Sequence, residues 1–582
     1  MMRVSWLFVT ICAGVFTSAL GRYVGRRADV PTVDLGYEIH QGSVNTTGDY
    51  YIFRNIPYAQ QPVGDLRFRK PVAIKDSGQE INNGTADGDA VVMCPQAYPQ
   101  WAINLMAERG GVSNDAMADL LNNQAGQTEA CLVLDVYVPI EIFNDGPAAD
   151  ASVLVWVHGG GFTFGSKTLY GNPAGIIARS RRDGEQGIIV IAINYRLGMF
   201  GWLSGNDTTP NLGLYDQRLA FEWVQEYIAL FGGNAEKVTA MGESAGASSI
   251  VHHITAYGGE QPAPFKSAIP QSPAFQFNIN FTENYDKTLA EATRQANTAI
   301  DSVKDLSKLS TDLLRTINQA TVTTAPTGTF GFGPGPDGTY VVAIPQVQLY
   351  QGKFDLAVDV SSSLPFSYLT SLSNATELTS HYQLLISHTA NESVSFTPSN
   401  ILTSADVESY VRTSLPEASD DTIHTLLTDP TLYPDILGSA DYPWTTEFER
   451  AARLSSDIGF ACTARYLSLA RDNETFDYLF AYPPGWHADD VPYVFYDGDM
   501  TTLDDGYPVN AALAYQLQDY IVAFAREGDP NIGLEGTAVE FPVYGPKARI
   551  LELGSDGVKE RGDDLSAVRC EWIQKAMVDG KL

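Results

Sequence analysis

The serine of a GESAG sequence at residues 242–246 has the clearest chemical potential in this chain. An apolar, β-branched run at 237–241 predicts a buried strand before it, and the proline-free residues 245–254 favour a helix after it. A strand that turns sharply into a helix around a serine is a nucleophile elbow, whose strained backbone presents the hydroxyl for attack on a carbonyl. Only small residues fit two positions away, which accounts for Gly242 and Gly246. The short pattern is common by chance, so the prediction depends on its flanking elements.

A second glycine-rich segment could stabilise the oxyanion that such an attack creates. HGGGF at 158–162 directly follows an apolar run at 152–157 that predicts another buried strand. A glycine triplet alone is more typical of a flexible loop, but a strand, a triplet and then an elbow is a rarer combination. We therefore predict an oxyanion hole formed by the backbone N–H groups of Gly160, Gly161 and Ala245.

Four further blocks accompany these motifs: PYAQQPVGDLRF at 57–68, EACLVLDVY at 129–137, NYRLG at 194–198 and NLGLYDQR at 211–218. Together they resemble the type-B carboxylesterase and lipase family, which includes the cholinesterases, and its secreted fungal members in particular. The resemblance extends over most of the chain. It implies an α/β-hydrolase fold, which is a large, mostly parallel central sheet flanked by helices with a nucleophile elbow. It also implies a serine carboxylic ester hydrolase.

The acid of a catalytic triad should follow the serine, because hydrolases of this fold run in the order nucleophile, acid, base. The run at 382–386 predicts a strand, and Glu392 follows it much as the family's acid does. The alternative is an ordinary solvated loop carboxylate. Ser387 stands where the family usually has glycine. The resemblance also implies that Ser272 hydrogen-bonds Glu392 from outside the triad.

The predicted base is His487, in the segment PPGWHADD at 483–490. This segment lies between strand-like runs at 476–480 and 493–495 and resembles the family's histidine loop, with Ala488 in place of the usual glycine. The other histidines lie on the elbow helix, in the glycine loop, or outside any motif.

In this triad the histidine takes the serine proton, and the carboxylate fixes the imidazole tautomer. The charge of Glu392 should raise the pKa of His487, whereas burial should lower it. We therefore expect a single ionisation between about 5.5 and 7.5 to control activity.

The chain begins with a basic start, a short apolar run and small residues, which predicts a secretory signal peptide over 1–21 with cleavage at about 19–21. Residues 22–582 should form a single domain, because no linker or internal repeat interrupts them. Seven N-x-S/T sequons favour N-glycosylation, although the one beside Glu392 is discounted. They start at Asn45, Asn83, Asn206, Asn280, Asn374, Asn391 and Asn473.

The signal peptide would remove Cys12 and leave four cysteines for an oxidising compartment. The resemblance implies a disulfide between Cys94 and Cys131. Whether Cys462 and Cys570 also pair is left open.

The net charge of −32 argues against nucleic acid or an anionic membrane as a partner. The histidines and cysteines lack the spacing of metal ligands, so we expect no metal, and no motif indicates a cofactor. After the signal peptide no window is long and apolar enough to span a bilayer. The expected partner is a small-molecule ester, and the oligomeric state is open.

Residues 95–130 form a candidate flap that carries apolar and polar side chains between two cysteines. It resembles the lid of the family's lipases, but a helix packed permanently against the body fits equally well. Three hypotheses remain. The first is a secreted carboxylesterase for small to medium esters, and the second is a lipase or sterol esterase with an interfacial lid. The third lies outside general ester hydrolysis: a biosynthetic esterase or acyltransferase, or a non-catalytic binding protein.

Overall fold

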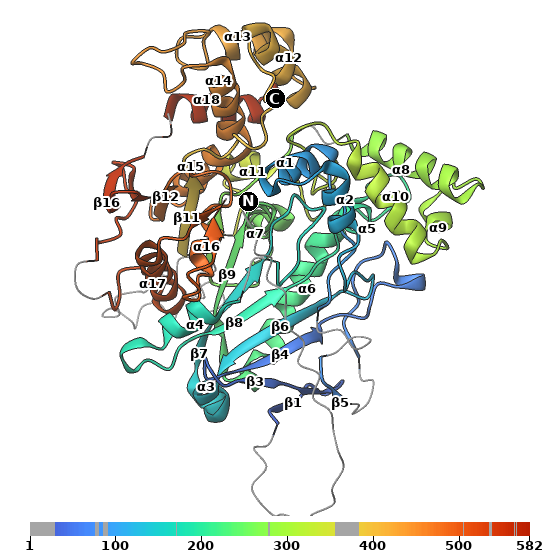
Figure 1. The fold of residues 1–582 in the computed structure, drawn as a ribbon, viewed down its shortest axis with the longest axis vertical. Coiled ribbons are helices and arrows are strands. Elements are labelled where there is room, and N and C mark those ends of the chain that lie inside the picture. Colours follow the sequence, from blue (N-terminus) through green and yellow to red (C-terminus); the bar gives the residue numbers. More distant parts are fainter. Residues whose placement is uncertain are drawn as a thin grey trace, which may run out of the picture.

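An eleven-stranded sheet forms the centre of the molecule, and helices flank it (Figure 1). The computed structural model describes residues 30–75, 81–84, 91–169, 172–277, 280–355, 383–504, 506–534, 538–563, 565 and 567–582. The predicted signal peptide, Cys12, Tyr382 and the sequon at Asn374 lie outside the described residues.

The sheet is mostly parallel, as the sequence predicts. Its strands lie in the order β16-β15-β12-β11-β10-β9-β7-β8-β6-β4-β3. Neighbours from β15 to β8 pair in parallel, and the pairs at the two ends are antiparallel. The strands are β3 (Ser43–Asn45), β4 (Tyr50–Pro57), β6 (Val133–Pro139), β7 (Ala151–Val157), β8 (Ile189–Ile193), β9 (Gly233–Glu243), β10 (Ser267–Gln271), β11 (Gln383–Thr389), β12 (Phe476–Ala481), β15 (Arg549–Gly554) and β16 (Gly557–Gly562).

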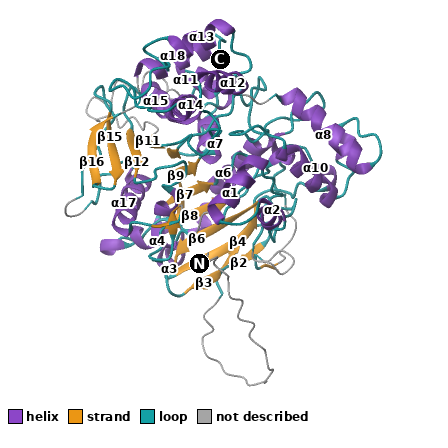
Figure 2. Cartoon of the chain, turned by 45° about the horizontal axis from the view of Figure 1, so that its top comes forward, coloured by secondary structure: helices purple, strands orange, loops and turns teal. Residues whose placement is uncertain are grey.

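Alternate side chains of β7 enter two different cores, because successive residues of a strand point to opposite faces. Val153, Val155 and Val157 pack in the core that includes side chains of α6 (Leu212–Tyr227) and α7 (Ala245–Ile254). Leu154 and Trp156 pack in the core that includes side chains of α4 (Ala174–Ser180) and α17 (Ala511–Glu527). Figure 2 shows helices on both sides of the strands. The continuous apolar run at 152–157 is therefore that of a strand covered on both faces.

Helices also gather away from the sheet faces. Figure 1 shows α12, α13, α14 and α18 together at the top and α8, α9 and α10 at the right. The bounds of these helices and of those not yet named are α1 (Gln100–Gly110), α2 (Asn114–Asn122), α3 (Ile140–Asp145), α5 (Gly198–Trp202), α8 (Phe281–Ala296), α9 (Val303–Leu306), α10 (Thr311–Thr323), α11 (Pro345–Tyr350), α12 (Ser404–Ser414), α13 (Asp420–Thr428), α14 (Glu447–Ser456), α15 (Cys462–Ala470), α16 (Val491–Val494) and α18 (Ala567–Val578).

One predicted strand is wrong. Residues 493–494 belong to the short helix α16 instead of a strand. The β-branched and aromatic residues suggested a strand, but Pro492 lies in the first turn of α16, where its fixed φ and missing N–H suit a helix.

Two of the sequence blocks are joined by a buried ion pair. The guanidinium of Arg196, from the NYRLG block, donates to both carboxylate oxygens of Asp216 at 2.6 and 2.8 Å. The hydroxyl of Tyr195 donates to the His158 carbonyl at 2.7 Å, and the Gln217 amide donates to Ser249 on α7 at 3.0 Å. These blocks therefore fasten both the glycine loop and the elbow helix.

Two disulfides cross-link the chain. Cys94 and Cys131 are joined, as the resemblance implies, and Cys462 is joined to Cys570, the pairing that the sequence leaves open. The first disulfide closes the segment that holds α1 and α2.

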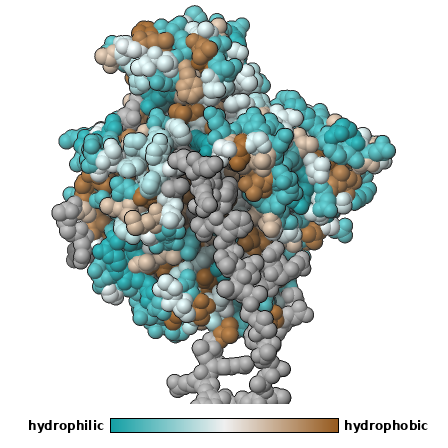
Figure 3. All heavy atoms as spheres, in the orientation of Figure 1, coloured by the Kyte–Doolittle hydropathy of each residue, from teal (hydrophilic) through white to brown (hydrophobic). Residues whose placement is uncertain are grey.

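The visible surface in Figure 3 is largely hydrophilic, with hydrophobic residues in small separate groups. Within the described residues, every helix is too short or too polar to cross a bilayer.

Candidate active site

The predicted elbow is present between β9 and α7. Ser244 has φ 56° and ψ −120°, a conformation that residues with a side chain rarely adopt. A Cβ on either Gly242 or Gly246 would overlap the carbonyl oxygen of Val157, at the end of β7. Glycine at these two positions thus lets the strand, the helix and β7 approach closely around the serine.

The glycine loop lies directly against the elbow. Gly160 and Gly161 have φ 105° and 58°, and a Cβ on Gly161 would overlap the Phe330 ring. Ala245 is the first residue of α7, where helical N–H groups are unpaired. Within the described part of the chain, no hydrogen bond uses the N–H of Gly160, Gly161 or Ala245. All three remain free to bind an oxyanion.

The loops that follow β11 and β12 bring Glu392 and His487 together. The N–H of Asn391 donates to the Gly485 carbonyl at 2.8 Å, which joins the two loops. His487 Nδ1 then donates to Glu392 Oε2 at 2.5 Å, and the Thr389 N–H donates to Glu392 Oε1 at 2.6 Å. Glu392 is fully buried, which excludes the alternative that it is an ordinary solvated carboxylate of a loop.

Ser272 has a weaker connection to Glu392 than the resemblance implies. The hydroxyl helps to lower the pKa of Glu392, yet it completes no hydrogen bond among the described residues. Ser387 is buried in β11, and its hydroxyl lies 3.5 Å from a carboxylate oxygen of Asp490. The strand continues through Ser387 to Thr389, so the serine does not disturb the loop that carries Glu392.

Two further buried carboxyls lie near the imidazole, and sequence analysis did not single them out. Glu243 Oε1 is 3.1 Å from His487 Nε2, although neither atom completes a hydrogen bond. Asp490 accepts from the Tyr478 hydroxyl at 2.8 Å and from the Gln271 amide at 3.1 Å. The sequence did contain a signal for both carboxyl groups. Glu243 directly precedes the serine of the elbow, and Asp490 follows the histidine by three residues.

No hydrogen bond joins Ser244 to His487 in this structure. The Nε2 atom has no hydrogen-bond partner within the described residues, and its near neighbour Glu243 is adjacent to Ser244 in the chain. Contacts of this kind are often long without substrate and tighten when it binds.

The neighbouring carboxyl groups determine the pKa of His487. Burial lowers the pKa of His487, but the charges of Glu243 and Glu392 and the hydrogen bond to Glu392 together raise it to about 9. Burial raises the pKa of Glu243 to about 8. The two groups therefore titrate as a coupled pair, and the histidine pKa lies above the interval predicted from sequence. That prediction considered one carboxylate, whereas two lie beside the ring.

Burial also raises the pKa of Glu392, but the charge and the hydrogen bond of His487 outweigh it and hold this pKa below the ordinary value. Glu392 is therefore ionised at neutral pH. It can orient the imidazole and stabilise its positive charge.

Two phenyl rings hold the imidazole from the cleft side. The ring centroids of Phe396 and Phe460 lie 5.2 and 4.8 Å from that of His487, both edge-on. Phe460 belongs to a π-helical turn, Asp457–Ala461, between α14 and α15. Such turns are rare and direct side chains that a regular helix would place elsewhere.

The candidate flap packs on the body through α1. The Trp101 indole donates to the Thr329 carbonyl at 2.7 Å and lies edge-on to Phe330 and Phe396. The guanidinium of Arg109 lies 4.4 Å from the centre of the Trp486 ring. The flap therefore contacts the residue before His487.

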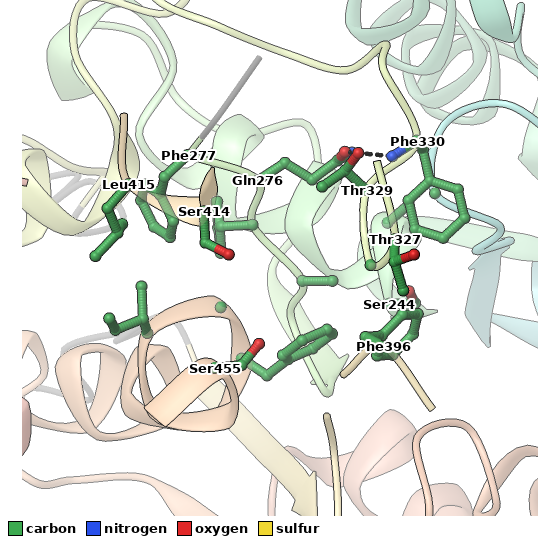
Figure 4. A pocket seen from close by; sticks show the side chains of 18 of the residues that line it. Ser244, Gln276, Phe277, Thr327, Thr329, Phe330, Phe396, Ser414, Leu415 and Ser455 are labelled. Atoms are coloured by element: carbon green, nitrogen blue, oxygen red, sulfur yellow. Dashed lines mark hydrogen bonds between the residues drawn. The ribbon is translucent and has the colours of Figure 1, made fainter. Parts of the chain in front are cut away.

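A cleft that is open at its mouth leads to Ser244 (Figure 4). Phenyl rings from several distant segments line it, and part of its wall is the loop 327–330. Residues 280–355 form helices α8 to α11 together with this loop.

Comparison with known proteins agrees with the fold. The model of the carboxylesterase family matches residues 36–570. Carboxylesterase patB of Aspergillus clavatus is 37% identical over 576 residues, covering 94% of this chain and 96% of that protein. Lipase 1 of Geotrichum candidum is 29% identical over 591 residues, with 94% and 96% covered. The crystal structure of Aspergillus niger EstA has a TM-score of 0.74 at 21% identity, with 95% and 99% covered.

The fold is that of the α/β-hydrolases. The chain belongs to the carboxylesterase family and is a carboxylic ester hydrolase.

The first prediction concerns pH. A histidine base must be neutral, so kcat/KM should fall as the pH drops through the raised pKa of His487, with a midpoint above ~6.5. Glu243→Gln removes one carboxylate and should lower this midpoint by roughly one unit. Glu236→Gln changes an exposed carboxylate on the same strand and should leave it in place. An unchanged midpoint in Glu243→Gln would show that Glu243 does not act on the base.

The second prediction concerns Ala488, which has φ 71° where the family usually has glycine. A left-handed alanine costs about 1–2 kcal/mol, more than the entropy that glycine loses on folding. Ala488→Gly should therefore raise the free energy of unfolding by about 0.5–1 kcal/mol in denaturant titrations. Ala512→Gly, at an exposed position of α17, should lower it by a similar amount. Destabilisation by Ala488→Gly would mean that the site does not strain this residue.

Proposed function

We propose that the protein is a secreted serine carboxylesterase in which Ser244 is the nucleophile, His487 the base and Glu392 the acid. The observation that carries the proposal is the buried His487–Glu392 hydrogen bond of 2.5 Å, with the other imidazole nitrogen, Nε2, 3.1 Å from Glu243 of the elbow. A histidine held in one tautomer next to a strained serine is the arrangement that acyl transfer requires.

In the first half-reaction His487 Nε2 accepts the proton of Ser244, and the serine oxygen attacks the ester carbonyl. The N–H groups of Gly160, Gly161 and Ala245 stabilise the tetrahedral oxyanion, and losing one such donor raises the barrier by roughly 3 kcal/mol. The imidazolium then gives its proton to the leaving alcohol, which leaves an acyl-enzyme on Ser244.

In the second half-reaction a water molecule gives a proton to His487 and attacks the acyl carbonyl. Collapse of the second oxyanion releases the carboxylic acid and returns the proton to Ser244. Glu392 remains ionised throughout and stabilises the imidazolium in both steps.

An esterase is favoured over a lipase by the contacts of the flap. Trp101 and Arg109 fasten residues 95–130 to the cleft loop and to the segment that carries His487. A lid that opened at an oil surface would have to break both contacts. We therefore propose the flap as a fixed wall of the site. The 37% identity to a protein named carboxylesterase supports the same choice.

Secretion is proposed from the predicted signal peptide and is supported by the two disulfides, which persist in oxidising compartments. Some relatives are named secreted lipases. We also propose N-glycans at the exposed sequons, except at Asn391, whose side-chain amide donates to the Pro484 carbonyl.

Substitution of the triad tests the mechanism. Ser244→Ala and His487→Ala should each lower kcat by about 10⁶-fold and Glu392→Ala by less, with little change in Tm. The Ser244/His487 double variant should be little worse than either single one, because the residues act as a unit. Ser409→Ala, His424→Ala and Glu408→Ala alter exposed residues of the same types and serve as controls. Full turnover in Glu392→Ala would show that another residue is the acid of the triad.

Covalent labelling tests the nucleophile separately. An organophosphonate should modify Ser244 and no other serine, because only an activated hydroxyl beside oxyanion donors reacts quickly. Peptide mapping by mass spectrometry locates the adduct. An adduct on Ser248, Ser249 or Ser272 would contradict the assignment of the elbow.

A further inference from the structure

The cleft beside Ser244 has two chemically different ends. Figure 4 shows Ser244 at one side with Phe330 and Phe396, and Ser414 and Ser455 at the other. The two ends differ in what they offer a bound ester.

The inner part of the cleft is aromatic. Figure 4 shows Phe330 and Phe396 beside Ser244, and the lining of the whole cleft includes four further phenyl rings, Phe162, Phe275, Phe277 and Phe460. Phe396 and Phe460 are stacked with centroids 5.3 Å apart, and Phe330 lies against Gly161 of the proposed oxyanion hole. Flat rings gain offset or edge-on contacts with such walls that a saturated chain does not.

The other part carries hydroxyl groups beside the side chains of Phe277 and Leu415 (Figure 4). The Tyr410 hydroxyl donates to Ser455 Oγ at 3.1 Å, which leaves the Ser455 proton available for a ligand. Among the residues that the structure describes, none hydrogen-bonds the hydroxyl of Ser414. In Figure 4 the hydroxyls of Ser414 and Ser455 face one another across the cleft.

The walls between these ends are fixed. Gln276 accepts from the Phe330 N–H at 2.8 Å and donates to the Phe332 carbonyl at 3.3 Å, and Trp101 donates to the Thr329 carbonyl. The π-helical turn that carries Phe460 is held by the Phe275 N–H, which donates to the Gly459 carbonyl at 2.8 Å. These hydrogen bonds hold both walls of the cleft.

We propose that this cleft selects esters in which one side of the ester bond bears an aromatic ring with a hydroxyl or carbonyl oxygen at its far end, in preference to long saturated chains. The ring would lie among the phenyl groups, and its oxygen would hydrogen-bond Ser414 and Ser455. A long alkyl chain would instead have to place methylene groups against those hydroxyls and leave them unpaired. This inference rests on the proposed esterase function of Ser244.

Matched ester pairs test the proposal on the full-length protein. For the acid side, the pair is 4-nitrophenyl 3-(4-hydroxyphenyl)propanoate and 4-nitrophenyl 3-phenylpropanoate. For the alcohol side, it is 2-(4-hydroxyphenyl)ethyl acetate and 2-phenylethyl acetate. Each is hydrolysed by wild type, by the double variant Ser414→Ala/Ser455→Ala, and by Ser409→Ala, which alters an exposed serine of the same helix α12.

We expect kcat/KM of wild type to favour the hydroxylated ester about five- to tenfold in one of the two pairs, the value of one hydrogen bond. The double variant should lose this preference, because its kcat/KM should fall mainly for the hydroxylated ester. Ser409→Ala should keep the preference. Both aryl esters of the acid side should also exceed 4-nitrophenyl dodecanoate.

Equal rates within both pairs in wild type, or a preference that survives in the double variant, would overturn the inference. Faster hydrolysis of the dodecanoate than of the aryl esters would overturn it as well. These outcomes differ from a failure of the proposed function, in which 4-nitrophenyl acetate would also remain intact or would be hydrolysed undiminished by Ser244→Ala.

Discussion

The close approach of β7, β9 and α7 is the constraint on which the rest of the site depends. The Val157 carbonyl occupies the space that a side chain at Gly242 or Gly246 would need. Because these backbones meet, the glycine loop after β7 lies against the serine after β9, and a Cβ on Gly159 would crowd both Glu243 and Ser244. The proposed nucleophile and oxyanion donors are thus positioned by backbone packing, and no flexible side chain has to place either of them. The cost is a serine held at φ 56°, which only a rigid surrounding sheet can maintain.

Electrostatics imposes the second constraint, because the same packing buries three carboxyl groups around one imidazole. Burial disfavours every charge there and raises the pKa of Asp490 to about 6 and that of Glu243 to about 8. Glu392 escapes this rise because the charge of His487 lowers its pKa, and hydrogen bonds from the imidazole N–H and the Thr389 N–H lower it further. Glu392 therefore keeps its charge and places it at Nδ1, where it orients the ring. Geometry thereby decides which of three similar groups can serve as the acid.

Much of the fold and of the candidate site could be predicted from the sequence, because these parts depend on residue patterns that are local in the chain. The elbow, the glycine loop and the strand before Glu392 depend on short runs whose backbone needs are visible in residue type, such as the glycines at 242 and 246. Helix α7 has the predicted bounds because nothing in residues 245–254 interrupts it. Residues 493–494 were misread because Val and Tyr favour strands, and the proline between Val491 and Tyr493 decided otherwise. The pKa of His487 was placed too low because the approach of Glu243 Oε1 to Nε2 depends on tertiary packing that no spacing reveals.

The wall of the cleft was least predictable, because distant segments assemble it through buried polar contacts. Phe460 is directed at His487 by the π-helical turn, and the turn depends on Asp457. That carboxylate is fully buried and accepts from the Tyr433 hydroxyl and from Arg569 on α18, both at 2.7 Å. The next residue along α18, Cys570, forms the disulfide to Cys462 just beyond the turn. A covalent bond and a buried ion pair therefore fix the same short segment from the same helix. Removing one partner of such a pair leaves an uncompensated buried charge. The C-terminal helix thus controls the orientation of the phenyl ring that borders the base, although it contributes no residue to the cleft itself.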